Sequence, residues 1–173
     1  MALAVCAYPE LKNDDYTEIQ KFRKEHDEYY SVIEPHFSFV FPVEGVKQAE
    51  FIEEIEKKSE GFEKIHVEIR CTTVNKDAFL DIYHLLLVPD KGYSNIVKLH
   101  DRLYSDILFN HLRLDIDFIP HLGIANSKDK YEVKKWADEW NGKDFLFAGS
   151  IESLMVVDYT DSVLTDIKKI QLK

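Results

Sequence analysis

A short pattern, proline and histidine followed by an apolar alternation, occurs twice and constrains the fold more than any other feature of the chain. The two copies are Pro35-His36-Phe37-Ser38-Phe39 and Pro120-His121-Leu122-Gly123-Ile124. Each is followed by apolar residues at helical spacing and then by a second strand-like run, which starts near Phe62 after the first copy and near Phe145 after the second. Two equivalent units packed about a pseudo-two-fold axis bring their equivalent strands face to face. We therefore predict an α+β fold of two pseudo-symmetric lobes, each an antiparallel sheet with flanking helices, around a central cleft.

Length and composition fit one core shared by both lobes. A chain of 173 residues with 45% hydrophobic content can bury most of its unfolded surface in one domain. No linker or low-complexity run interrupts the sequence. We expect residues 1–173 to form a single domain of two lobes.

Apolar periodicity places the individual elements. Strands are expected at residues 3–7, 36–43, 62–74, 79–88, 121–126, 145–159 with a bulge near Gly149, and 163–172. Helices are expected at residues 14–30, 45–59, 96–107 and 129–140, with turns at 89–92 and 160–162.

Strand alternation assigns the side chains of the two histidine strands to faces. On the first strand His36, Ser38 and Val40 share one face, and Phe37, Phe39 and Phe41 share the other, which we expect to point to the core. On the second, His121, Gly123 and Ala125 lie opposite Leu122 and Ile124. The histidine side of the second strand therefore carries only small residues beyond the imidazole and leaves space for a ligand.

Two imidazoles in one cleft suit the cleavage of a phosphodiester. Imidazole titrates near neutral pH, so one copy can be neutral and take a proton from an attacking oxygen while the other protonates the leaving oxygen. Such a pair needs no metal, and the Ser38 hydroxyl is placed to hydrogen-bond a phosphoryl oxygen.

His36-Phe37-Ser38-Phe39 resembles the motif of the two-histidine (2H) phosphoesterases, or 2'-5' RNA ligase-like proteins, in which His-x-Thr/Ser-x occurs once on a strand of each lobe. His121-Leu122-Gly123-Ile124 resembles the second motif, with Gly123 in place of its hydroxyl residue. The resemblance implies hydrolysis of 2',3'-cyclic phosphates, cleavage of RNA ends or 2'-5' linkages, or the reverse ligation. It implies His36 and His121 as acid and base in unassigned order, with Ser38 as a phosphate ligand. At Gly123 a lost hydrogen bond would weaken catalysis, or the backbone N–H would hold the phosphate instead.

Charge and cysteine content limit the partners. Lys and Arg number 22 and Asp and Glu 32, a net charge of −10, which disfavours duplex DNA and leaves a small anionic ligand in a local pocket open. The family resemblance implies that this ligand is a small nucleotide or an RNA 3' end. Cys6 and Cys71 lie in apolar runs as small buried hydrophobes, which fits a reducing compartment. The apolar start of the chain is too short for a signal segment, and no stretch reaches transmembrane length. We expect a cytoplasmic monomer that uses no cofactor and no membrane.

The other histidines and charged clusters favour structural roles. His26 and His100 lie on apolar helix stripes, His111 is expected in a loop, and His84 is expected to be buried and hydrogen-bonded. His66 shares a strand face with Lys64, Glu68 and Arg70, most simply a solvated face, although His66 or Arg70 beside the cleft could bind phosphate. Lys128, Lys130, Lys134 and Lys135 fit a solvated helix surface, with phosphate binding as the alternative.

Three hypotheses follow. The leading one is a metal-independent phosphodiesterase built on His36 and His121. The second is a catalytically weakened nucleotide- or RNA-end-binding module, in which Gly123 marks the loss of efficient turnover. The third is a metal-dependent enzyme that uses His121 with Asp115 or Asp117, although no second ligand cluster at a recognisable spacing supports it.

Overall fold

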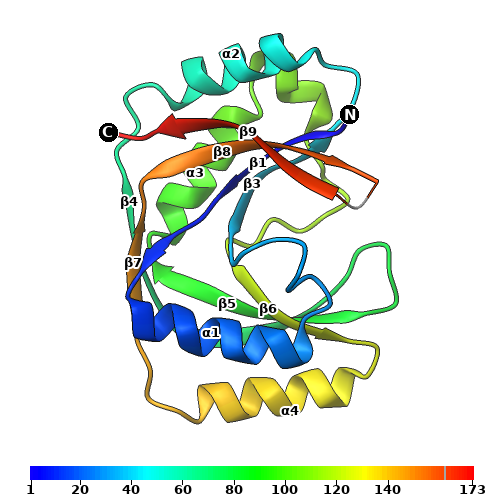
Figure 1. Cartoon of the computed structure of the whole chain (residues 1–173), viewed down its shortest axis with the longest axis vertical. Coiled ribbons are helices and arrows are strands. Elements are labelled where there is room, and N and C mark those ends of the chain that lie inside the picture. Colours follow the sequence, from blue (N-terminus) through cyan, green and yellow to red (C-terminus); the bar gives the residue numbers. More distant parts are fainter. Residues whose placement is uncertain (162) are drawn as a thin grey trace.

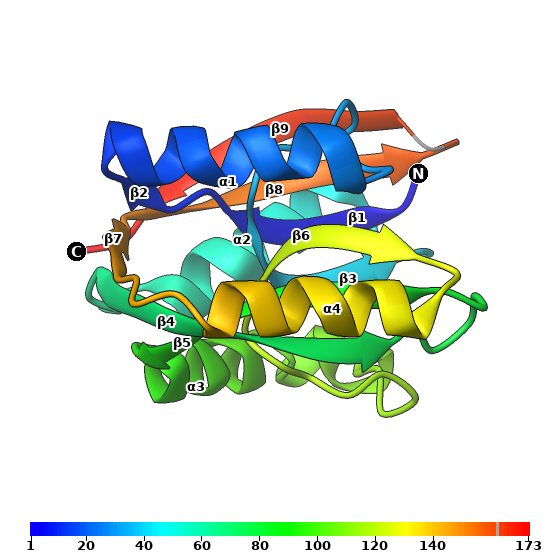
Figure 2. The ribbon, with the colours of Figure 1, turned by 90° about the horizontal axis from the view of Figure 1, so that it is seen from below.

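The strand-forming runs of the chain assemble into two antiparallel sheets (Figures 1 and 2). The computed structural model describes residues 1–161 and 163–173. The first sheet has the order β3-β1-β8-β9 and contains β1 (Leu3–Ala7), β3 (Phe37–Val43), β8 (Ser153–Thr160) and β9 (Val163–Gln171). The second has the order β2-β7-β4-β5-β6 and contains β2 (Glu10–Leu11), β4 (Ile65–Lys76), β5 (Tyr83–Lys91), β6 (Leu122–Ser127) and β7 (Phe147–Ile151). The two strands that follow the predicted histidines, β3 and β6, are therefore edge strands of different sheets.

Two of the helices pack on a strand of the other sheet from the main strand that precedes them. Helix α1 (Asn13–His26) follows β1 of the first sheet but packs on β6 of the second. Helix α3 (Tyr93–Leu103) follows β5 of the second sheet but packs on β3 of the first, and also contacts β4 and β5. Helix α2 (Gln48–Ser59) packs on α3, and α4 (Lys130–Asn141) covers β4, β5 and β6 beside α1 (Figure 2). The order β-α-β-α-β thus occurs twice, as β1-α1-β3-α2-β4 and β5-α3-β6-α4-β7.

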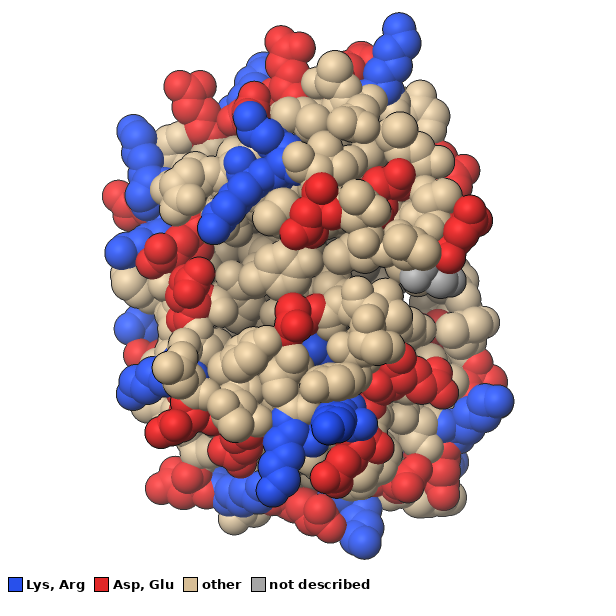
Figure 3. Space-filling model, in the orientation of Figure 1, with Lys and Arg blue, Asp and Glu red and all other residues tan. Residues whose placement is uncertain are grey.

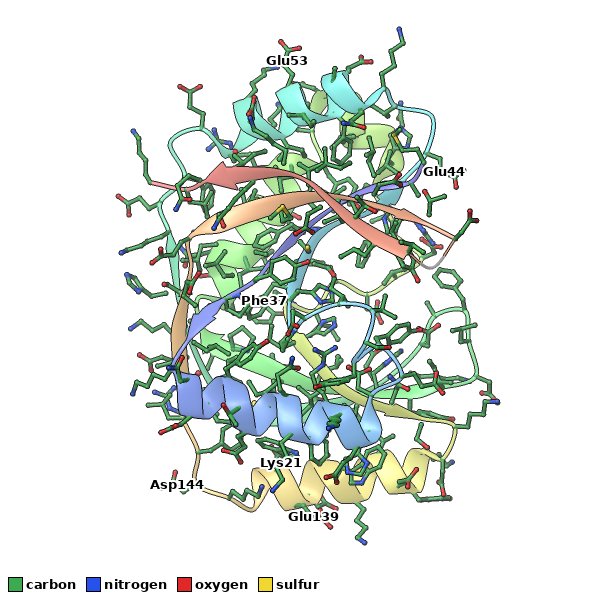
Figure 4. All side chains as sticks on the ribbon, viewed as in Figure 1. Lys21, Phe37, Glu44, Glu53, Glu139 and Asp144 are labelled. Carbon is green, nitrogen blue, oxygen red and sulfur yellow. The ribbon has the colours of Figure 1, made fainter. Side chains whose placement is uncertain are left out.

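The predicted α+β architecture of two antiparallel sheets with flanking helices is confirmed. Its core is built from the inward faces of both sheets and the apolar stripes of the helices. Phe37, labelled in the middle of the molecule in Figure 4, is fully buried at the start of β3, as is Phe39 two residues later. Leu85, Leu87, Leu122 and Ile124 are equally buried on β5 and β6. No helix of the described residues is both long and apolar enough to cross a membrane.

Bulges explain two errors in the predicted faces. β4 contains one more residue than β5 between the pairs Ile69–Pro89 and Cys71–Val88, so the alternation shifts at Arg70. Cys71 is exposed as a result, whereas the sequence predicts it to be buried. β3 has an extra residue between Val40 and Val43, and Phe41, predicted to point to the core, instead lines the pocket described below.

Other boundaries differ because pairing between distant segments decides them. Residues 89–91, predicted as a turn, belong to β5, and only Gly92, at φ +87°, reverses the chain. The predicted strand 145–159 is two strands in different sheets, separated at Glu152 rather than at Gly149. Glycine is required at 149 for close approach, because a Cβ there would lie 2.4 Å from the carbonyl oxygen of Glu10 on β2.

Helix ends also differ from the predictions. α1 ends at His26, because the Asp27 side chain accepts a hydrogen bond from the Tyr29 N–H and starts a turn. α3 ends at Leu103, and a 3-10 helix, η1 (Asp106–His111), contains His111, which the sequence places in a loop. The turn predicted at 160–162 includes Ser162, which lies outside the described residues.

Candidate active site

A pocket of about 560 Å³ lies between the two sheets and collects the predicted site residues. His36 and Ser38 reach it from the first sheet, and His121 and Gly123 from the second. On the face seen in Figure 3, acidic and basic side chains are interspersed around a band of neutral residues that crosses the middle of the molecule. The fold therefore brings together four residues that are up to 87 positions apart in the sequence, because 123 − 36 = 87.

The two histidines are held in the same way. His36 Nδ1 lies 2.9 Å from the carbonyl oxygen of Glu34, and His121 Nδ1 hydrogen-bonds the carbonyl oxygen of Ile119, in each case two residues earlier. A carbonyl can only accept, so Nδ1 carries the proton and Nε2 presents a lone pair. A proline separates each histidine from that carbonyl and keeps the preceding residue extended, which suits this geometry. Both imidazoles are thus fixed in the tautomer whose Nε2 can accept a proton.

Burial favours the neutral form of both rings. It lowers the pKa of His36 from 6.5 to about 4, against the opposing effect of the Glu34 carbonyl. Positive charge on His121, when that ring is protonated, and the charge of Arg23 lower the pKa of His36 further. Burial likewise lowers the pKa of His121, opposed by the Ile119 carbonyl and assisted by His84. Both imidazoles are therefore neutral near pH 7 in the unliganded protein. A bound phosphate anion would favour protonation of one of them, which provides an acid beside a base.

The positions two residues after the histidines differ. Ser38 is half-buried on the pocket wall, where its hydroxyl can donate to a ligand oxygen. A Cβ at Gly123 would meet no atom within 4 Å, so the wall beside His121 has open space where the wall beside His36 has a hydroxyl.

A buried ion pair supports the strand of His121. Arg23 of α1 is 2% exposed, and its Nε donates to Asp27 at 2.7 Å. The other oxygen of Asp27 accepts from Nδ2 of Asn126 on β6 at 2.8 Å. The remaining donors of Arg23 bond Gln20 and the carbonyl oxygens of Tyr29 and Ile33. This network ties α1 to β6 from within the pocket wall, although nothing in the local sequence around Arg23 pointed to the site.

The strand of His36 is supported by hydrogen bonds to its backbone. His100 of α3 donates from Nδ1 to the carbonyl oxygen of Phe39 at 2.8 Å, and the Tyr104 hydroxyl accepts from the Phe41 N–H at 2.8 Å. The His100 ring stacks on Phe118, 3.5 Å between centroids, in the segment that leads to His121. His100 is thus a packing histidine, as the sequence indicated.

A third imidazole also lines the pocket. His84 on β5 is hydrogen-bonded, as predicted, through Nε2 to Asp77 at 3.0 Å, but it faces the same cavity as His36 and His121. Sequence reasoning missed this placement, although the alternation of His84 with Leu86, which also lines the pocket, was a usable signal.

The remaining candidates lie elsewhere or are paired. His26 packs between Phe22 and Trp136 on the outer helices. His66 and Arg70 are exposed on β4 outside the pocket, and Arg70 is ion-paired with Glu68 and Asp90. Of the basic cluster on α4 and just before it, Lys134 pairs with Asp138 and Lys135 with Glu139, and none of the four lysines lines the pocket.

Asp115 and Asp117, the candidate metal ligands, do line the pocket. Asp115 accepts two hydrogen bonds from Arg113, each 2.8 Å. Within residues 1–161 and 163–173, no three potential ligands among His, Cys, Asp and Glu come together. The hypothesis of a metal-dependent enzyme therefore gains no support from the described residues.

Comparisons with known proteins identify the family of the chain. The model of the 2'-5' RNA ligase superfamily matches residues 9–162. A Geobacillus sp. (strain WCH70) protein named "Putative phosphoesterase" is 26% identical over 128 residues, 72% of this chain and 69% of that protein. A protein of the same name from Geobacillus kaustophilus (strain HTA426) is 21% identical over an equal length and equal shares of both chains.

Solved structures share the fold. TT0787 of Thermus thermophilus superposes with a TM-score of 0.66 at 12% identity, covering 99% of this chain and 98% of that one. E. coli LigT without ligand superposes with a TM-score of 0.56 at 13% identity, covering 99% and 97%. Because the family model spans nearly the whole chain, including both histidine strands, the chain belongs to the 2'-5' RNA ligase superfamily, the 2H phosphoesterases.

Proposed function

We propose that the chain is a metal-independent phosphodiesterase that cleaves 2',3'-cyclic phosphates, or 2'-5' linkages in nucleotides and RNA ends, with His36 and His121 as acid and base. The observation that carries the proposal is the matched pair of imidazoles in one pocket, each with Nδ1 bonded to a backbone carbonyl. Membership of a phosphoesterase family supports the reaction class. Solved complexes of E. coli LigT with 3'-AMP and with ATP support a nucleotide as the ligand.

In the proposed reaction, Nε2 of one histidine removes a proton from water as the water oxygen attacks phosphorus. Nε2–H of the other histidine donates a proton to the ribose oxygen as its bond to phosphorus breaks. The Ser38 hydroxyl donates to a phosphoryl oxygen, and the open space at Gly123 admits the phosphate close to the backbone. Because residues of one chain line the pocket, we propose that a monomer suffices. The exposed free thiol of Cys71 is compatible with a reducing, cytoplasmic setting.

The test is turnover of 2',3'-cyclic nucleotides and short 2'-5' oligonucleotides, with EDTA present, by the intact protein and by His36→Ala and His121→Ala. Each substitution is expected to reduce kcat about 10²- to 10⁴-fold while the protein remains folded, since both rings lie on the wall of the pocket. The matched control is His66→Ala, which removes an exposed histidine outside the pocket and should leave turnover unchanged. Inactivation by EDTA, or unfolding of both variants, would overturn the assignment.

The second candidate function is a nucleotide-binding module with weakened catalysis, favoured by the missing hydroxyl at Gly123. It predicts binding of the same nucleotides without turnover by the intact protein.

A further inference from the structure

Three polar side chains form a row across the second sheet, inside the pocket. His84 on β5 pairs with Asn75 on β4 and with Asn126 on β6. Directly opposed residues of antiparallel strands point to the same side of the sheet, and all three line the pocket. The next pairs toward His121 are Leu85–Ala125 and Leu86–Gly123, which offer no polar side chain. The row therefore lies beyond the open space at Gly123, toward the turn between β4 and β5.

The hydrogen bonds of His84 fix which atom it offers. Asp77 Oδ2 lies 3.0 Å from Nε2, and Asp77 Oδ1 accepts from the N–H groups of Phe79 and Leu80 at 2.8 and 2.7 Å. The carboxylate is thus anchored in the turn and accepts the Nε2 proton. In the neutral ring, Nδ1 of His84 remains as a hydrogen-bond acceptor.

Asn126 offers a second acceptor. Its side chain is buried, with 7% of the residue exposed, and donates from Nδ2 to Asp27, which can only accept, so the orientation of the amide is determined. Oδ1 is buried and has no hydrogen-bond partner in the part of the chain that the structure describes. A buried acceptor without a donor is costly in a protein interior and indicates a donor that is missing.

The charges around the row disfavour a second anion. The carboxylates of Asp77, Asp115 and Asp117 line the same pocket, and Asp115 is paired with Arg113. Arg23 uses its guanidinium for Asp27, Gln20 and two carbonyl groups, and Lys76 pairs with Asp81 at 3.3 Å. Acceptors and carboxylates at this end suit a ligand group that donates hydrogen bonds and carries no negative charge.

We propose that Asn75, His84 and Asn126 bind the uncharged, donor-bearing part of a nucleoside, a hydroxyl or amino group, and so restrict the substrate to one whose only phosphate is the scissile diester. This inference rests on the proposed function for the position of the phosphate. It makes nucleoside 2',3'-cyclic phosphates with a free 5'-hydroxyl the preferred class. It disfavours RNA ends, 2'-5' oligonucleotides and other substrates within the proposed function that carry further phosphates.

The experiment compares adenosine 2',3'-cyclic phosphate with its 5'-phosphorylated counterpart. The intact protein is expected to show a kcat/KM at least about tenfold lower for the 5'-phosphorylated nucleotide. His84→Leu, which removes the acceptor, should raise KM for the 5'-hydroxyl substrate about tenfold with kcat nearly unchanged. His84→Asn, which keeps a polar group near the position of Nδ1, should restore part of the loss, and the control His66→Leu should change neither constant.

Equal or better turnover of the 5'-phosphorylated nucleotide would overturn the proposal. So would a His84→Leu variant in which only kcat falls, because His84 would then act through His121 rather than on the substrate.

Calorimetric binding of 3'-AMP and of adenosine 3',5'-bisphosphate separates this inference from the proposed function. If 3'-AMP binds more tightly than the bisphosphate but neither cyclic nucleotide is turned over, the binding role of the row is supported and the proposed reaction is contradicted. Turnover without a preference for the 5'-hydroxyl nucleotide, or no binding of either ligand, would contradict the binding role of the row.

Discussion

The two histidine strands, β3 and β6, share a scaffold and differ in what they place beside the histidine. Both are edge strands, both begin directly after a proline and a histidine, and both fix the imidazole through a carbonyl two residues earlier. β3 then presents the Ser38 hydroxyl, whereas β6 presents the open space of Gly123. Backbone geometry that fixes the imidazole is thus the same in both lobes, and the lobes diverge at the positions that meet the rest of the substrate.

The two strands also differ in the interactions that hold them in place. α3 holds β3 through neutral hydrogen bonds to the backbone from His100 and Tyr104. α1 holds β6 through the buried pair of Arg23 and Asp27, which reaches the Asn126 side chain. The ion pair that supports β6 is therefore itself part of the pocket wall. Breaking it should destabilise the protein more than breaking a hydrogen bond to β3.

The largest expected effect is the difference in stability between variants that break the support of β6 and variants that break the support of β3. Asp27→Ala leaves Arg23 charged and unpaired in the interior, and we expect a loss of about 3–5 kcal/mol in the free energy of unfolding. Tyr104→Phe removes one neutral acceptor from β3 and should cost about 1 kcal/mol. Urea unfolding of both variants measures the difference, and similar losses would show that the two supports are equivalent.

Exchanging the residues beside the histidines should have an intermediate effect. Ser38→Ala is expected to lower kcat/KM about tenfold or more, because the hydrogen bond to a charged phosphoryl oxygen is lost. Gly123→Ser adds a hydroxyl where a side chain has room, and should raise kcat/KM by up to about tenfold. Gly123→Ala is the control, because it fills the same space without a hydroxyl. Equal activities of the serine and alanine variants would mean that the second motif does not need the hydroxyl.

The pH dependence of stability should give the smallest effect. Burial holds the pKa of His36 at about 4, below its ordinary value of 6.5. As the pH falls from 6.5 to about 4, the unfolded chain binds a proton at this site that the folded protein does not, so this site lowers the free energy of unfolding over that range. We expect the effect to be modest, because solvent that enters the pocket reduces the burial penalty.

The measurement is urea unfolding of the intact protein and of His36→Gln near neutral pH and near pH 5. The intact protein should lose more stability between the two conditions than the variant, in which the titrating group is absent. An equal loss would show that protonation of His36 does not oppose folding.

Local patterns in the sequence were enough to predict helices α1 to α4, most of the strands and the α+β class, as well as the meeting of His36 and His121 in one pocket. They failed where distant segments decide the outcome. A bulge opposite Pro89 exposes Cys71, and the single predicted run 145–159 divides between two sheets at Glu152. Asn126 enters the site through the register of β5 with β6, which no short motif encodes.

The packing of α1 and α3 on strands of the opposite sheet suggests how this fold could have arisen by duplication of a single β-α-β-α-β repeat. In the first repeat, α1 packs on β6, and in the second, α3 packs mainly on β3, so the main packing strand of each of these two helices belongs to the other repeat. A single repeat expressed alone would expose the apolar side of its helix and leave its histidine strand unsupported. Two copies of such a repeat could form a helix-swapped homodimer, in which each copy covers the apolar helix face of the other and one pocket lies at the interface. Gene fusion of that dimer would allow the two copies to change independently, and the contrast between Ser38 and Gly123 is an asymmetry that a homodimer of identical chains could not have.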